Sequence, residues 1–256
     1  MDQITLQLPP GYTSLTALDR HKHAGRAILP DRDYAWCSKL NSVFLNVVEL
    51  GKACADYPIA FVRETNSGEY LPVALLGLRT GENLFVDDKS QWRTRTYLPA
   101  YVRRYPFCIA EVPAQDGGEP QRLICVQEDQ LGPAVKPYFD AQGEPTADWM
   151  PVKDLIEAVE SARQQTRAFT RRLEAFGLFA PFDALAMPRG GGQQMRLQGL
   201  HRVDEEKLNA LGSREQKLLM RKGELRAVYA HLLSIENFAR LLDMTAELDG
   251  RRNPAN

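Results

Sequence analysis

The chain has 256 residues, of which 44% are hydrophobic and 25% are charged, and its formal net charge is -1. These values exclude a disordered chain and are enough for one large domain, or for two small domains that share a core. A near-neutral charge also argues against duplex DNA or an anionic membrane as the main partner, because either would favour an overall positive excess.

The N-terminal residues lack the basic start and continuous apolar run of a signal peptide. No later segment approaches the roughly 18 apolar residues of a membrane span. We therefore expect a cytoplasmic protein. The cysteines are far apart, without C-x-x-C spacing and without the Cys and His clustering that zinc needs, so we expect free thiols in a reducing compartment. They are Cys37, Cys54, Cys108 and Cys125. The sequence also contains no phosphate loop, dinucleotide fingerprint or metal cage, so we expect no metal site and no cofactor.

Proline and glycine interrupt residues 1–30, which predicts an extended lead-in with a short strand near residues 27–29. Residues 31–56 carry a mostly helical pattern that Pro58 ends. Three short runs rich in apolar and β-branched residues follow between residues 59 and 87, and turns at 65–68 and 79–82 separate them. They predict an antiparallel meander, and residues 123–127 predict another strand.

After Trp149, apolar residues recur at a helical period as far as Phe176, with Gly177 beyond the end, which predicts a long helix. Arg163, Arg167 and Arg171 lie on one face of this helix. This face is either solvated or binds an acidic partner. Residues 182–200 predict a hairpin around Gly190–Gly192, whose glycines form a loop tip or cradle a phosphate. Two helices follow, at residues 204–211 and 215–248, the second broken near Gly223.

These elements predict an α+β fold: a largely antiparallel N-terminal β-sheet with a flanking helix, and a C-terminal helical part. We expect a sheet-rich part at residues 1–145 and a mainly helical part at residues 146–256. The long helix must bury its apolar stripe against the remainder, so we expect one cooperative globular unit.

The segment from residue 92 to residue 104 is the strongest candidate site. Basic and aromatic residues alternate there without any acid. Guanidinium groups bind carboxylates or phosphates bidentately, and aromatic faces stack on sugars or bases, so the segment suits an anionic or glycan ligand or a protein partner. The alternative is that the rings are core residues and the arginines pair with nearby acids. We call this segment the Arg/aromatic platform: Trp92, Arg93, Arg95, Tyr97, Tyr101, Arg103 and Arg104.

Histidines suggest two weaker sites. His21 and His23 flank Lys22 and, in a strand, would point the same way as two metal ligands, with a third from His201, His231 or Glu49. Tyr229, His231 and Ser234 combine hydroxyl and imidazole groups, although no orienting acid is evident. In both cases the alternative is a structural histidine.

Several blocks resemble the SapC family of bacterial proteins, over about residues 15 to 243. They are YPIAFV, PVALLGLRTGENLFVD, YLPAYVRRYPF, FDAQGEPT, GLHRVDEEKLNAL and GELRAVYAHLLSIENFARL. The family carries an S-layer-associated name and is distinct from the membrane-spanning permease that shares its letters. The resemblance implies a role at the bacterial surface or in outer-membrane uptake, with TonB-receptor systems and halogenase-like proteins as neighbours. It supplies no catalytic residues; His23, Asn83, Tyr229 and His231 lie in blocks that look like the family's.

Two functions remain open. The first is a cytoplasmic accessory protein that binds a partner protein or an anionic or glycan ligand through the Arg/aromatic platform. The second is an enzyme that modifies small molecules or peptides, assisted by a metal ion held by His23 with other histidines or carboxylates. The lack of a recognisable catalytic constellation favours the first.

Overall fold

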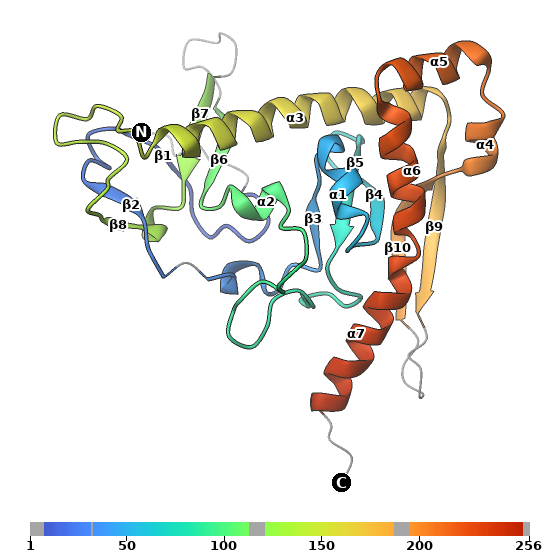
Figure 1. Cartoon of the computed structure of the whole chain (residues 1–256), viewed down its shortest axis with the longest axis horizontal. Coiled ribbons are helices and arrows are strands. Elements are labelled where there is room, and N and C mark those ends of the chain that lie inside the picture. The colour runs from blue at the N-terminus through green and yellow to red at the C-terminus, as the bar shows by residue number, and fades with distance from the viewer. Residues whose placement is uncertain (1–7, 32, 113–120, 187–194, 253–256) are drawn as a thin grey trace. The chain divides into compact units, whose positions relative to one another are not determined.

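The computed structural model describes residues 8–31, 33–112, 121–186 and 195–252 (Figure 1). The chain divides into two compact units, each built from two stretches of sequence. Unit 1 contains residues 1–36 and 102–161, and unit 2 contains residues 37–101 and 162–256. Antiparallel sheets combine with helices that gather toward the C-terminus, which confirms the predicted α+β class.

Unit 1 contains five short strands: β1 (Thr16–Ala17), β2 (Arg26–Ile28), β6 (Phe107–Val112), β7 (Gln121–Val126) and β8 (Leu131–Pro133). They form a three-stranded sheet in the order β1-β7-β6 and a separate β2-β8 pair. A 3-10 turn, η3 (Glu128–Gln130), connects β7 to β8. The strands predicted near residues 27–29 and 123–127 are confirmed as β2 and β7.

Aromatic residues hold the core of unit 1 together. The ring of Trp149 lies 5.6 Å from Phe107, 5.5 Å from Tyr138 and 5.3 Å from Phe139, measured between ring centroids. Large rings that meet at tilted or edge-on angles bury much apolar surface per residue. This cluster joins β6 to the turn-rich residues before the long helix.

Unit 2 is built on a five-stranded sheet in the order β3-β5-β4-β10-β9. Its strands are β3 (Ser42–Phe44), β4 (Ile59–Arg63), β5 (Tyr70–Leu75), β9 (Phe179–Ala186) and β10 (Met195–Val203). The hairpins predicted around residues 65–68 and within residues 182–200 are confirmed by the β4-β5 and β9-β10 pairings. The predicted turn at residues 79–82 does not join two strands. The glycines of the second loop, Gly190–Gly192, lie outside the described residues.

Two sequence predictions need correction. The third run of the meander, residues 83–87, contributes only an isolated bridge between Val86 and Trp92. The mostly helical pattern predicted for residues 31–56 becomes η1 (Ala35–Cys37), β3, η2 (Val47–Glu49) and the single turn α1 (Leu50–Ala53). Val43 pairs with Ala74 of β5, so partners distant in sequence override a local helical preference.

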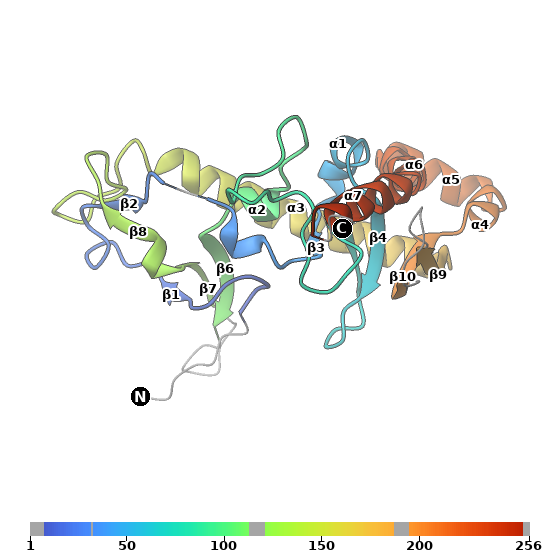
Figure 2. The same ribbon diagram turned by 90° about the horizontal axis from the view of Figure 1, so that it is seen from below.

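The long helix is confirmed as α3 (Met150–Ala175), which runs through residue 161, where unit 1 ends. After it come α4 (Glu205–Asn209), α5 (Ser213–Arg221), α6 (Glu224–Ser234) and α7 (Asn237–Arg252). The predicted break is Gly223, with φ of 69°, a left-handed conformation that glycine adopts without a Cβ clash. Figure 2 shows α5, α6 and α7 following one another within unit 2.

The predicted division into residues 1–145 and 146–256 follows the order of elements along the sequence, whereas the contacts define two interleaved units. One cooperative unit remains a prediction. Among the described residues, every helix is too short or too polar to cross a membrane.

Candidate functional site

The Arg/aromatic platform crosses the boundary between the two units. Its residues from Trp92 to Tyr101 belong to unit 2, whereas Arg103 and Arg104 belong to unit 1. Residues 92–97 therefore form the longest irregular part of the platform within one unit, and we call them the arginine loop. A short helix, α2 (Ala100–Arg103), follows this loop.

The start of the arginine loop is fixed to the segment that precedes it. Trp92 forms a bridge with Val86, and its ring stacks on Phe85 with centroids 6.2 Å apart. The backbone N–H of Arg93 donates a 2.7 Å hydrogen bond to the carbonyl of Phe85. The loop therefore leaves the core from a defined position.

The end of the arginine loop is held by two carboxylates. The backbone N–H of Tyr97 donates to Asp56 Oδ2 at 2.8 Å, and the Tyr97 hydroxyl donates to Glu49 Oε1 at 2.9 Å. The Tyr97 carbonyl accepts a short hydrogen bond from the hydroxyl of Tyr57. Both ends are thus anchored, which limits the conformational entropy that the loop would lose on binding a ligand.

The arginine side chains and the aromatic rings have different environments. Trp92 and Tyr101 are 9% and 7% exposed and belong to the core, and Tyr97 is half-buried. Arg93 and Arg95 are exposed, and within the described part of the chain neither guanidinium group has an ion pair or hydrogen bond. Guanidinium groups, rather than ring faces, are what this loop offers to a ligand.

The backbone of Arg95 is strained. Its φ is 60°, in the left-handed region that residues other than glycine rarely adopt. Such a conformation costs on the order of 1–2 kcal/mol and is often found at functional positions. In unit 1, Arg103 is exposed and Arg104 half-buried, and both interact with other residues of the protein.

Glu49 is the residue whose role sequence reasoning missed, since it entered only as a third metal ligand. Its carboxylate is buried and accepts hydrogen bonds from four donors. Oε2 accepts from the N–H and Nδ2 of Asn46 at 2.8 and 2.9 Å, and Oε1 accepts from the Tyr97 hydroxyl and the Ala100 N–H. The available signal was the spacing of Asn46 and Glu49, which matches a capping box.

Asn83 also holds backbone together. Its Nδ2 donates to the carbonyl of Cys37 at 2.9 Å, and its Oδ1 accepts from the N–H of Phe85 at 2.9 Å. Both amide atoms therefore shape the segment that leads into the arginine loop. Nearby, a Cβ at Gly77 would lie 2.2 Å from the carbonyl oxygen of Glu82, so glycine is required by close backbone approach.

His231 is fully buried in α6, and both ring nitrogens bind backbone. Nε2 accepts from the N–H of Val203 at 3.0 Å, and Nδ1 lies 2.9 Å from the carbonyl of Ile59, to which it donates in the neutral tautomer. Burial lowers the pKa of the imidazole to about 4. The neutral ring thus joins α6 to β4 and β10.

The hydroxyl groups predicted beside His231 do not converge on its ring. Tyr229 is 45% exposed, on the outer side of α6. Ser234 is buried, donates to the backbone carbonyl of His231 at 2.6 Å, and accepts from the N–H of Ile59 at 2.9 Å. Ser234 and His231 therefore connect the helix α6 to the sheet through hydrogen bonds.

His21 and His23 lie in a turn rather than in a strand, so their rings do not share a face. His23 is buried with Nδ1 2.8 Å from the carbonyl of Asp19, whereas His21 is exposed. The proposed third ligands, His201, His231 and Glu49, belong to unit 2. The described residues contain no group of three His, Cys, Asp or Glu side chains that could hold a metal ion, and the metal-assisted alternative stays untested.

Two further features receive structural explanations. All four cysteines are free, and burial raises the pKa of the Cys108 thiol to about 11, which disfavours the reactive thiolate. Two arginines of the row on α3 pair with an acid of this chain: Arg167 Nε and Arg171 Nε each donate to Glu69 at 2.9 Å.

Comparison with known families identifies one match. The sequence model of the SapC family matches residues 18–241, which is most of the chain. A search of curated proteins and a search of solved structures found no match.

Proposed function

Because this chain belongs to the SapC family, we propose that it is a cytoplasmic accessory protein of a bacterial surface-layer or outer-membrane uptake system. In this proposal the arginine loop binds an acidic surface of a partner protein, or an anionic or glycan ligand. The partner systems implied by the family resemblance are those of TonB-dependent receptors and halogenase-like proteins.

One observation carries the proposal: the exposed guanidinium groups of Arg93 and Arg95, which have no ion pair or hydrogen bond with the described residues, lie on a loop whose two ends are anchored. Arginine forks recognise carboxylates and phosphates bidentately. A fixed loop presents such forks without a large ordering cost, which favours recognition of an anion. The left-handed backbone of Arg95 adds support, because strain is retained where the surrounding structure or a function requires it.

Affinity capture from the host tests the proposal, with wild type compared against Arg93→Gln/Arg95→Gln by mass spectrometry of the bound proteins and small molecules. The matched control is Arg214→Gln/Lys217→Gln, which removes the same charge from exposed positions on α5. We expect a companion that is lost from the loop variant, retained by the control variant and released as salt rises. Retention of every companion by the loop variant would place the interface elsewhere.

A further inference from the structure

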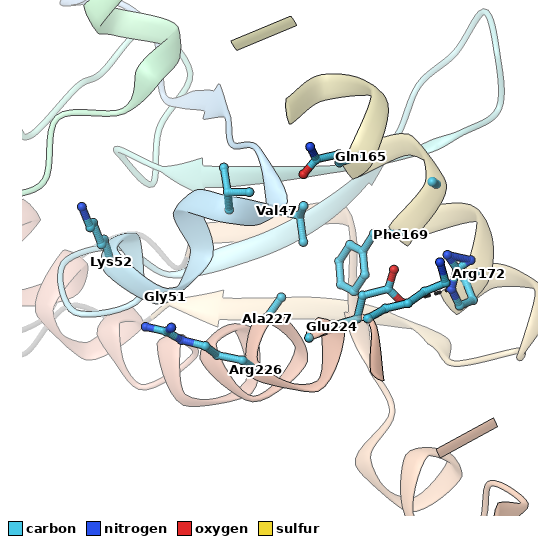
Figure 3. A pocket seen from close by; sticks show the side chains of 13 residues that line it. Val47, Gly51, Lys52, Gln165, Phe169, Arg172, Glu224, Arg226 and Ala227 are labelled. Carbon is cyan, nitrogen blue, oxygen red and sulfur yellow. Dashed lines mark hydrogen bonds and ion pairs between the residues drawn. The ribbon is translucent and has the colours of Figure 1, made fainter. Parts of the chain in front are cut away.

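Unit 2 also contains a pocket whose lining differs from the arginine loop. This pocket of about 690 Å³ opens among η2, α1, α3 and the start of α6 (Figure 3). Neither Arg93 nor Arg95 lines it. Its lining residues are Val47, Val48, Gly51, Lys52, Gln165, Ala168, Phe169, Arg172, Lys222, Gly223, Glu224, Arg226 and Ala227.

The inner surface of this pocket is apolar. Phe169 and Ala227 are buried, and Val47 is half-buried. Figure 3 shows the Phe169 ring projecting from α3 toward α6, with Val47 nearby. At the rim, Val48 is 63% exposed, which is unusual for a large aliphatic residue and extends the apolar surface outward.

The remaining lining is strongly cationic. Glu224 is the only acidic lining residue, and it is already paired with Arg172 at 3.0 Å. Lys52, Lys222 and Arg226 have no ion pair or side-chain hydrogen bond within the residues that the structure describes. Three positive charges that form no ion pair with the described residues therefore line one pocket, although the whole chain carries a net charge of -1.

The backbone adds to this positive potential. The eleven-residue helix α6 begins in the pocket wall, and its N-cap, Gly223, has no side chain to accept from the first-turn N–H groups. Unpaired N–H groups at a helix N-terminus favour a negative charge. On the other side, the Arg226 side chain lies against Gly51 of α1, where a Cβ would come within 3.3 Å of Arg226 Nε. Glycine there leaves room for the guanidinium group at the rim.

We propose that this pocket binds a small organic anion with an apolar body: its carboxylate or phosphate group lies among Lys52, Lys222 and Arg226, and its apolar part lies against Val47 and the exposed Val48. The volume falls in the range of small-molecule sites, about 300–1,000 Å³. The concave shape favours a small molecule over an acidic protein segment, which needs a longer surface.

Octyl phosphate is a suitable probe, since it joins an apolar chain to a phosphate. Inorganic phosphate lacks the chain, and octyl glucoside replaces the anionic group with a neutral one. In titration calorimetry below micelle formation, we expect octyl phosphate to bind one to one, and each comparison compound to bind at least about tenfold more weakly, because hydrogen bonds to charged groups and apolar burial both contribute. Equal binding of octyl phosphate and octyl glucoside, or no binding of octyl phosphate, overturns the proposal.

Variants locate the binding. Lys52→Gln/Lys222→Gln/Arg226→Gln changes only exposed side chains, and we expect octyl phosphate to bind at least about tenfold more weakly. The control Arg214→Gln/Lys217→Gln/Arg221→Gln removes the same charge from exposed α5 positions outside the lining and should leave binding unchanged. Glu224→Gln removes the only acidic lining residue and should strengthen binding. Equal losses in both triple variants would mean non-specific attraction and overturn the assigned site.

Two further measurements separate the alternatives. The loop variant Arg93→Gln/Arg95→Gln should bind octyl phosphate as wild type does, so failure of this site and failure of the proposed function give different results. If a ten-residue polyglutamate peptide binds wild type more tightly than octyl phosphate and the pocket variant loses that binding, the occupant is an acidic protein segment and the small-molecule assignment is wrong.

Discussion

The hydroxyl of Tyr97 donates a 2.9 Å hydrogen bond to the buried carboxylate of Glu49, 48 residues earlier in the chain. Glu49 in turn accepts from three further donors, all of them within unit 2. A single carboxylate therefore fixes both the start of η2 and the end of the arginine loop. The position of the exposed arginines therefore depends on a buried acid.

Glu49→Gln tests this dependence. The substitution keeps the shape but replaces one acceptor oxygen with an NH₂ group that faces N–H or O–H donors. We expect a loss of roughly 2–3 kcal/mol in the free energy of unfolding, because a buried donor is left without an acceptor. Urea denaturation measures it, with the exposed Glu247→Gln as the matched control. Equal stability of the two variants would contradict this role for Glu49.

Stability should depend on pH through His231. Its pKa is lowered to about 4 from an ordinary value of 6.5, because burial disfavours the charged ring. Between pH 4 and 6.5 the unfolded chain binds more protons, so stability rises with pH across this window and is fully present above 6.5. The shift corresponds to about 3 kcal/mol. The pKa values of the Asp19, Glu69 and Glu128 carboxyl groups are lowered, so protonation of these groups affects stability only at more acidic pH.

NMR titration of the His231 ring protons measures this directly, and urea denaturation between pH 5 and 7 gives the accompanying change in stability. A His231 ring that becomes protonated near pH 6.5 in the folded protein would disprove the predicted shift.

Gly77→Ala should destabilise the segment that precedes the arginine loop. The added Cβ would meet the backbone carbonyl of Glu82 at 2.2 Å, so backbone has to move. We expect a cost of about 1–3 kcal/mol by thermal or chemical denaturation. Gly250→Ala, in α7 with open space around its Cβ position, is the control and should be neutral or stabilising. Similar effects at the two positions would show that close approach is not what matters at Gly77.

Arg95→Gly should change the stability of the fold and the binding of a partner in opposite directions, or leave stability unchanged while binding falls. Glycine relieves the left-handed strain at this position, so the free energy of unfolding should be unchanged or rise by up to about 1 kcal/mol. Partner binding should fall with the loss of the guanidinium group. Arg93→Gly, at a position without positive φ, should lower both quantities. If Arg95→Gly binds as wild type does, Arg95 has no part in recognition.

The chain should unfold in one cooperative transition, as expected from the sequence. The 26-residue helix α3 contributes to both units, so melting of either unit removes support from the same helix. Calorimetry measures this as agreement between calorimetric and van't Hoff enthalpies. Two resolved transitions would instead assign independent stability to the two units.

The sequence predicted best where the signal is local. The strands β4 and β5 and the helix α3 follow from short apolar runs and a helical period, and the break at Gly223 follows from one residue type. Residues 31–56 were misjudged, because Val43 is a strand residue only through its pairing with β5. Such a pairing depends on residues about thirty positions away, which a local periodicity does not contain.

The same limit applies to the candidate site. Alternation of arginine and aromatic residues identified the platform, yet it did not separate the buried Trp92 from the exposed Arg93. Sequence patterns likewise gave no indication of the pocket, since Lys52, Phe169 and Arg226 come from three distant segments. Only the fold brings these residues together.

The two sides of the helix α6 are under different structural constraints. Its inner side holds His231 and Ser234, whose hydrogen bonds tie the helix to the sheet, while its outer side exposes Arg226, Tyr229 and Leu233 to solvent. Substitutions on the outer side leave the sheet connections intact. Substitutions at these exposed positions can therefore change the charge and polarity of this face while the fold is kept.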